Sequence, residues 1–187
     1  MAVVGTDYKE KLTINFCFET LLVSLRKIST MTTTYNTINI GKGLNNILFG
    51  IKRADLKALL GEPNEKELYN ASEDDDYQTE DWHYDELEIS FSFDEEDGWK
   101  LTSIGSSSPD IAINGKKLMG MSLDEVIDAT ENMNLGDNEL VDLSEDDGNQ
   151  QLLSFLESSI NFWFEDNELT EIQWGVQWTD EDTPKWP

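Results

Sequence analysis

One alternating segment occurs twice in this chain. In residues 89–93 (Ile-Ser-Phe-Ser-Phe) apolar side chains alternate with serines, and in residues 160–164 (Ile-Asn-Phe-Trp-Phe) the same apolar row returns 71 positions later. A period of two places the apolar row on one face of a β-strand and the polar row on the other. An acidic turn and a Leu-Thr-x-Ile segment follow each copy. The sequence therefore predicts one β-hairpin formed twice, over residues 87–105 and 158–175.

The similarity extends upstream of each hairpin to a predicted helix. Residues 49–60 and 119–132 each carry apolar side chains at the three- and four-residue spacings of a helix. The first helix ends at a Gly-Glu-Pro sequence, and the second begins at Ser122 with Glu125 as the partner of a capping box. A short strand precedes each helix, and a long acidic connection and three antiparallel strands follow it.

These elements define the predicted fold class and domain organisation. We predict a single α+β domain over residues 31–187, formed by two tandem α-β repeats at about residues 37–105 and 110–178. The repeats are expected to build one antiparallel sheet with the helices on one face. A chain of 187 residues is long enough to bury one good core.

Residues 1–30 differ from the rest in composition. They hold four basic and three acidic residues, whereas the whole chain holds 13 basic and 39 acidic ones. Two interpretations stay open. Either Met31 is the natural start and the residues before it are a mobile upstream extension, or residues 16–28 form an amphipathic helix that docks on the domain.

The apolar segment at residues 12–25 indicates neither a membrane span nor an export signal. It contains Glu19, is followed by Arg26 and Lys27, and is shorter than the roughly 20 residues that a spanning helix needs. No small-residue cleavage site follows it. We therefore expect the protein in the cytoplasm and not at a membrane.

The net charge of −26 favours a basic protein as the partner and disfavours nucleic acid. The alternative is that the acidic residues serve only solubility. Catalysis has less support, because the chain has one cysteine and one histidine, which excludes an intramolecular disulfide and the common histidine-rich metal sites. We expect no enzymatic activity, no cofactor and no metal, with an acidic hydrolase as the remaining enzyme alternative.

The helix-opening sequence at residues 48–56, followed by Leu-Gly-Glu-Pro at residues 60–63, resembles the motif that opens each repeat of β-lactamase inhibitor proteins and of outer-membrane assembly lipoproteins. The second copy matches through residues 120–126 but lacks the Leu-Gly-x-Pro ending. The resemblance implies a tandem platform whose concave sheet face and loops hold another protein. By charge and class the chain is also similar to bacterial immunity proteins, although no residue of those families is matched.

Acidic residues beside the predicted strands are the first candidate binding sites. In a meander, residues 73–76 and 94–97 should share one end of the sheet, and residues 145–147 and 165–168 should be neighbours in the second repeat. Such carboxylates could pair with lysines and arginines of a nuclease active site, or they could form only a solvated rim.

Two tryptophans complete the prediction. Trp163 is out of phase with the apolar row and is therefore the best single anchor, unless the N-terminal segment or a second copy covers it. The sequence does not determine on which face of the sheet Trp174 lies. The predicted partner-binding residues are Asp74, Asp75, Asp76, Glu95, Glu96, Asp97, Glu145, Asp146, Trp163, Glu165, Asp166 and Trp174.

These observations predict a cytoplasmic protein inhibitor. The expected form is an immunity protein that covers the active site of a basic antibacterial toxin, such as a nuclease, in a one-to-one complex. The alternative is a non-catalytic adaptor or assembly module that binds a protein or peptide through its sheet.

Overall fold

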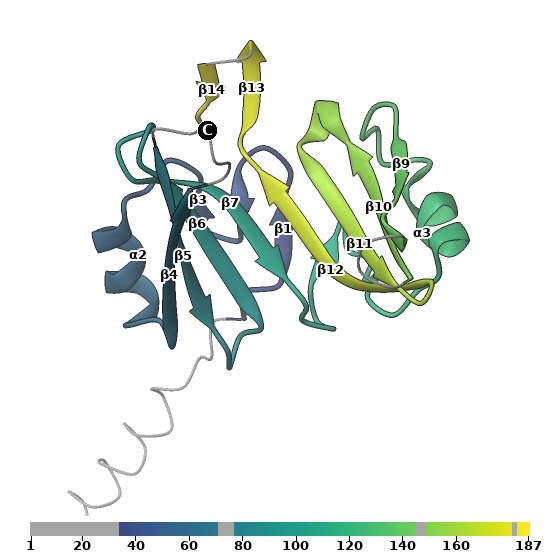
Figure 1. Ribbon diagram of the computed structural model, residues 1–187, viewed down its shortest axis with the longest axis horizontal. Helices are drawn as coiled ribbons and strands as arrows, with labels where there is room; N and C mark the ends of the chain where they lie inside the picture. The colour runs from purple at the N-terminus through teal and green to yellow at the C-terminus, as the bar shows by residue number, and fades with distance from the viewer. Residues whose placement is uncertain (1–33, 71–76, 145–148, 181–182) are drawn as a thin grey trace, which may run out of the picture. The chain divides into compact units, whose positions relative to one another are not determined.

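The computed structural model describes residues 34–70, 77–144, 149–180 and 183–187 (Figure 1). The chain divides into two compact units, residues 1–34 and 35–187, and the second contains all of the described helices and strands. The predictions for residues 1–30 therefore lie outside the described residues. No helix in the described part of the chain is long and apolar enough to cross a membrane.

Most of the described elements are strands. The strands are β1 (Thr37–Asn39), β2 (Gly43–Leu44), β3 (Ile47–Leu48), β4 (Glu65–Asn70), β5 (Gln78–Tyr84), β6 (Ile89–Asp94), β7 (Lys100–Ser106), β8 (Ala112–Ile113), β9 (Glu139–Asp142), β10 (Gln150–Phe155), β11 (Ile160–Glu165), β12 (Glu168–Gly175), β13 (Gln177–Asp180) and β14 (Thr183–Lys185). The helices are α2 (Arg53–Leu60), α3 (Leu123–Thr130) and the short 3₁₀ helix η1 (Leu156–Ser158).

Eight strands form one large antiparallel sheet in the order β4-β5-β6-β7-β12-β11-β10-β9. The two predicted hairpins are both present, as β6–β7 and β11–β12, and they pair Phe91 with Ile104 and Phe162 with Ile172. Strands β7 and β12 join the two halves by pairing Ser106 with Ile172 and Ile104 with Trp174. Ile104 and Ser106 occupy the positions in the first half that Ile172 and Trp174 occupy in the second. A local two-fold axis therefore exchanges these two pairs and passes through the pair between them, Gly105 and Gln173.

The two hairpins also share an irregularity. Each has a β-bulge, between Ser92 and Phe93 in the first and between Trp163 and Phe164 in the second. The extra residue is a threonine in both cases. The Thr102 hydroxyl donates to the Ser92 carbonyl at 3.2 Å, and the Thr170 hydroxyl donates to the Trp163 carbonyl at 3.2 Å. A bulge of this kind changes the phase of a strand, so the Leu and Ile of each Leu-Thr-x-Ile segment both face the core.

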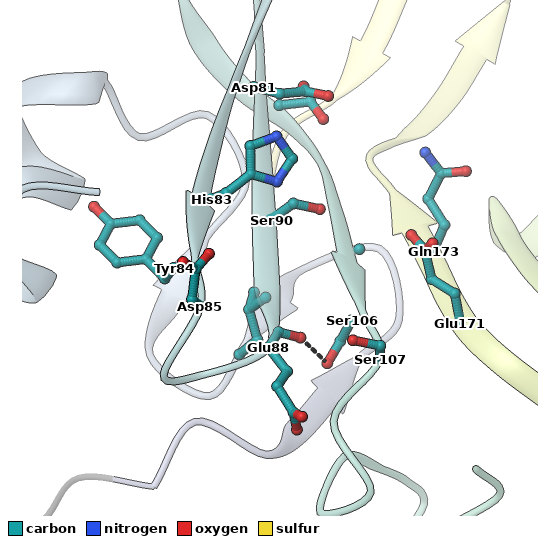
Figure 2. Close-up of a pocket in the computed structure, with 13 residues that line it drawn as sticks. Asp81, His83, Tyr84, Asp85, Glu88, Ser90, Ser106, Ser107, Glu171 and Gln173 are labelled. Atoms are coloured by element: carbon teal, nitrogen blue, oxygen red, sulfur yellow. Dashed lines mark hydrogen bonds between the residues drawn. The ribbon is translucent and has the colours of Figure 1, made fainter. Parts of the chain in front are cut away.

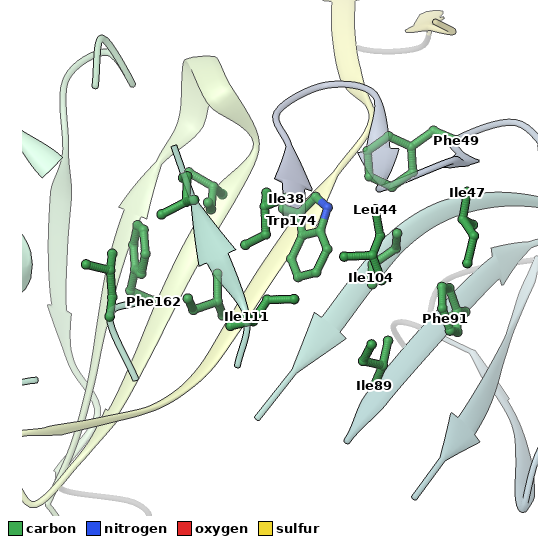
Figure 3. Close-up of a cluster of buried hydrophobic side chains, with 14 of the residues drawn as sticks. Ile38, Leu44, Ile47, Phe49, Ile89, Phe91, Ile104, Ile111, Phe162 and Trp174 are labelled. Atoms are coloured by element: carbon green, nitrogen blue, oxygen red, sulfur yellow. The ribbon is translucent and has the colours of Figure 1, made fainter. Parts of the chain in front are cut away.

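A second, four-stranded sheet covers the inner face of the large one. Its order is β3-β2-β1-β8, with β1 and β8 parallel. Ile38, Leu44 and Ile47 from this sheet are buried against Phe91 and Ile104 of the large sheet (Figure 3). Leu56 of α2 and Val126 of α3 belong to the same core. The core therefore lies mainly between two sheets.

The predicted fold class, α+β with helices packed on one face of a single sheet, is wrong. The protein is mostly β, and its two described α-helices have eight residues each. The segments expected as opening strands of the repeats, β1 and β8, form the second sheet with β2 and β3. A further strand, β4 or β9, also precedes each acidic connection. The capping box at Ser122 and Glu125 is confirmed by a 2.9 Å bond from the Ser122 amide to the Glu125 carboxylate.

The two hairpin tips lie at opposite ends of the large sheet. Because β7 and β12 are antiparallel, the β6–β7 tip lies at the Lys100 end of β7 and the β11–β12 tip lies beyond its Ser106 end (Figure 1). The two groups of acidic residues predicted from the sequence therefore cannot form one continuous patch.

Candidate functional site

The outer face of the large sheet is polar at its centre. Apolar and polar residues alternate along β5, β6, β11 and β12, so the face opposite the core presents Ser90, Ser92, Glu171 and Gln173. A recess of about 440 Å³ opens there (Figure 2). It is lined by residues of the sheet and its turns, namely Asp81, His83, Tyr84, Asp85, Glu88, Ile89, Ser90, Ser92, Gly105, Ser106, Ser107, Glu171 and Gln173.

Gly105 creates the floor of this recess. It pairs with Ser90 on β6 and with Gln173 on β12. A Cβ atom at position 105 would lie 2.6 Å from Glu171 Oε1 and 2.7 Å from Ser90 Oγ, which is closer than side chains approach. A glycine in a strand interior weakens the strand and often marks a place where another group approaches the backbone. Here the glycine leaves space for the Glu171 carboxylate.

Four acidic residues, Asp81, Asp85, Glu88 and Glu171, and one histidine line the recess. The Tyr69 hydroxyl donates to Asp81 Oδ2 at 3.0 Å, whereas Asp81 Oδ1 and His83 Nε2 are buried and have no hydrogen-bond partner within the described part of the chain. Burial raises the pKa of Glu171, the negative charge of Asp81 raises it further, and His83 opposes both effects. The arrangement can accept hydrogen bonds from a bound cationic group or exchange a proton with it.

Replacing Glu171 by glutamine is expected to change how stability depends on pH. Because the pKa of Glu171 is raised in the folded state, the folded protein binds this proton more readily than the unfolded chain. Its contribution to stability is therefore present below the ordinary carboxyl pKa and is lost as pH rises through the raised value. Glu171→Gln should flatten this decrease and raise the free energy of unfolding at neutral pH by less than about 1 kcal/mol.

Urea unfolding at a series of pH values measures this effect. Glu168→Gln removes the same charge from an exposed position at the tip of the same hairpin and serves as the control. Identical pH profiles for the two variants would contradict the assignment of a raised pKa to Glu171.

One predicted anchor is wrong. Trp174 is 1% exposed, and its indole N–H donates to the Gly43 carbonyl at 3.1 Å, so its side chain joins the two sheets and does not anchor a partner. The bulge in β12 explains the error, because it shifts the phase of the residues that follow Leu169. Trp163 is half-buried and pairs with Leu152 and Glu171, which are its neighbours across the sheet.

The predicted acidic residues are only partly described. Asp74, Asp75, Asp76, Glu145 and Asp146 lie outside the described residues. Their flanking residues do reach the expected hairpin tips: the Gln78 amide donates to Glu95 at 3.2 Å, and the Asn149 side chain donates to Asp166 at 3.2 Å.

The remaining acidic residues are mainly solvent-exposed. Glu95, Glu96, Glu165 and Asp166 are exposed. Asp97 is half-buried, and burial together with Asp94 raises its pKa, while Lys100 opposes that shift. The structure does not bring these tip residues together with the recess.

The sequence reasoning missed Asp81, His83, Gly105 and Glu171. The sequence carried two signals of this site: a glycine inside a strand pattern, and an acidic residue between two apolar core positions. No group of three or more His, Cys, Asp or Glu residues within the described ranges is arranged to hold a metal ion.

No family model and no curated protein matches this chain. Among solved structures, the chain is similar to an extracellular protein containing a SCP domain from Bacillus anthracis str. Ames, at 15% sequence identity and a TM-score of 0.41. The similarity covers 68% of this chain and 43% of that one. At this TM-score the similarity carries no argument about fold or function.

Proposed function

We propose that this protein is a non-catalytic inhibitor that binds a basic protein through the outer face of its large sheet. The partner class is an antibacterial toxin such as a nuclease, against which the protein acts as a cytoplasmic immunity protein in a one-to-one complex. The observation that carries the proposal is the acidic recess at the centre of the sheet, where no lysine or arginine is among the described lining residues. The net charge of −26 supports it, because it accelerates encounter with a cationic protein.

A second recess supports docking of a protein on this face. It has a volume of about 390 Å³ and shares Gln173 with the first recess. Its lining includes Leu156 and Trp178, which are 74% and 48% exposed. An exposed aromatic residue beside a polar recess combines the apolar contact and the hydrogen bonding that protein interfaces use at their centres.

The proposal predicts a strong dependence of binding on salt. The protein and the cationic product of the neighbouring gene should co-purify as a one-to-one complex, and co-expression should restore growth in the presence of the toxin. The association rate should fall by about tenfold or more when salt is raised from low to high concentration, because exposed charges are then screened. Stopped-flow or surface-based kinetics measure this. Absence of a complex, or an association rate indifferent to salt, would contradict the proposal.

The edge strands of the large sheet, β4 and β9, each pair with a single described strand, which favours a second candidate function, an adaptor that binds a peptide strand. All residues of β4 and β9, the two edge strands, are exposed, including Leu68, Leu140 and Val141. An extended peptide could pair with either edge through its backbone. Binding of this kind should be insensitive to salt and to substitutions in the recess, which distinguishes it from the inhibitor.

A further inference from the structure

We propose that the recess on the outer face of the large sheet binds the guanidinium group of an arginine side chain that protrudes from the protein partner. This inference rests on the proposed function, because it names the group that the same face recognises.

The position of the recess is the first argument. It lies on the local two-fold axis, at the pair of Gly105 and Gln173. The inner-face positions of the two halves are similar, as in Phe91 and Phe162. The positions that line the recess differ between the two halves. Asp81 and His83 stand where the other half has Leu152 and Ser154, as the pairings of β5 with β6 and of β10 with β11 show. The symmetric scaffold thus departs from its symmetry where the recess forms.

The second argument is that two polar atoms beside the recess lack hydrogen-bond partners within the described residues. Tyr69 occupies one oxygen of Asp81, which fixes that carboxylate and leaves its buried Oδ1 unpaired. His83 Nε2 is also buried without a partner within the described residues. Glu171 projects into the space above Gly105. Unpaired buried polar atoms cost free energy. Both atoms are closed off from solvent, so a donor in the recess offsets that cost once the two side chains turn toward it.

The third argument is charge. Four acidic residues line the recess, among them Asp81 and Glu171, and its described lining residues include one histidine but no lysine or arginine. A positive group that offers several donors in different directions therefore suits this recess. Guanidinium carries five N–H donors in a planar fork and loses less hydration than an ammonium group, so arginine fits this recess better than lysine.

The probe for this inference is Nα-acetyl-L-arginine N-methylamide, titrated into the isotope-labelled full chain and followed by NMR. We expect saturable, millimolar binding with the largest amide shifts at Ser90, Gly105 and Gln173. The lysine analogue should bind more weakly, and the citrulline analogue, which has the same shape without the charge, should not saturate. Equal saturation by citrulline would overturn the proposal, because the recess would then recognise shape alone.

Two variants inside the recess and one control outside it test the site. Glu171→Gln should weaken binding of the arginine probe by about tenfold, since it removes one charge-assisted interaction. Gly105→Ala should abolish binding by filling the floor of the recess, provided that its spectrum shows a folded protein. Glu168→Gln makes the same charge change outside the recess and should bind normally. Similar affinities for Glu171→Gln and Glu168→Gln would overturn the proposal even if Gly105→Ala fails to fold.

The outcome is separable from that of the proposed function. A protein that binds a cationic toxin but not the probe refutes the arginine recess and leaves the inhibitor standing. A protein that binds the probe in the recess but no cationic protein supports the recess and refutes the inhibitor.

Discussion

Gly43→Ala is expected to lower the free energy of unfolding by about 3 kcal/mol or more, enough to unfold a marginally stable domain. Gly43 has a φ of +133°, and a Cβ atom there would lie 2.0 Å from the carbonyl oxygen of Ile47. Neither a rotamer change nor a small shift relieves this contact, because the neighbour is backbone of the paired strand β3. The same residue accepts the Trp174 hydrogen bond, so movement of β2 would also disturb the contact between the sheets.

Urea unfolding of Gly43→Ala measures this loss, and Gly98→Ala is its matched control. Gly98 also has a positive φ, of +71°, but no atom of another described residue, its chain neighbours apart, lies within 4 Å of the added Cβ position. The control should therefore show only the backbone strain of a left-handed alanine, about 1–2 kcal/mol. Equal losses in the two variants would mean that β2 rearranges and that the close contact is unimportant.

Trp174→Ala is expected to cost about 3–5 kcal/mol, as truncation of a fully buried aromatic side chain does. The indole is packed between the two sheets, and its N–H bonds to the Gly43 carbonyl (Figure 3). The variant loses the apolar contact and leaves a cavity, and the carbonyl loses its indole donor. Thermal and urea unfolding measure the effect.

Trp163→Ala is the control for this prediction, because it makes the same truncation on the neighbouring strand β11 and the opposite face of the sheet. Its cost should be less than about 1 kcal/mol, as for residues outside the core. A larger loss for Trp163 than for Trp174 would refute the assignment of the two faces.

The hairpins could be predicted from the sequence because their pattern is local. Alternation in residues 89–93 and 160–164 specifies which side chains face inward, and the structure confirms both hairpins. The bulges were harder to predict from the sequence, although the Leu-Thr-x-Ile segments contained their signature. The three-residue separation between Leu169 and Ile172 cannot fit a regular strand with both residues in the core, and the extra Thr170 resolves this.

The fold class could not be predicted, because the covering layer depends on short, irregular strands. Asn45 has a φ of +49°, and its side chain accepts hydrogen bonds from the amides of Asn36 and Thr37, which turns the chain back on itself. These contacts make strands of two or three residues, too short to show a period. Pairing of β1 with β8 joins segments about 75 residues apart, which no local pattern reveals.

The candidate site depends on a similar long-range contact. Gly105 and Gln173 become neighbours only when β7 and β12 pair, so the recess has no signature in any single segment. The net charge predicted a cationic partner. The sequence then placed most of the predicted contacts at the acidic hairpin tips, away from the recess. The acidic tips are separated by the length of the sheet.

The exposed edge strands make the solubility of this protein depend on its ionisation. β4 carries Glu65 and Glu67, and β9 carries Glu139 and Asp142, so two copies approaching edge to edge repel each other at neutral pH. Near the isoelectric point, about 4.1, that repulsion disappears while the edge strands and Leu68 remain exposed. Acidification should then let sheets from different molecules join edge to edge into longer assemblies, so these carboxylates should oppose self-association at neutral pH.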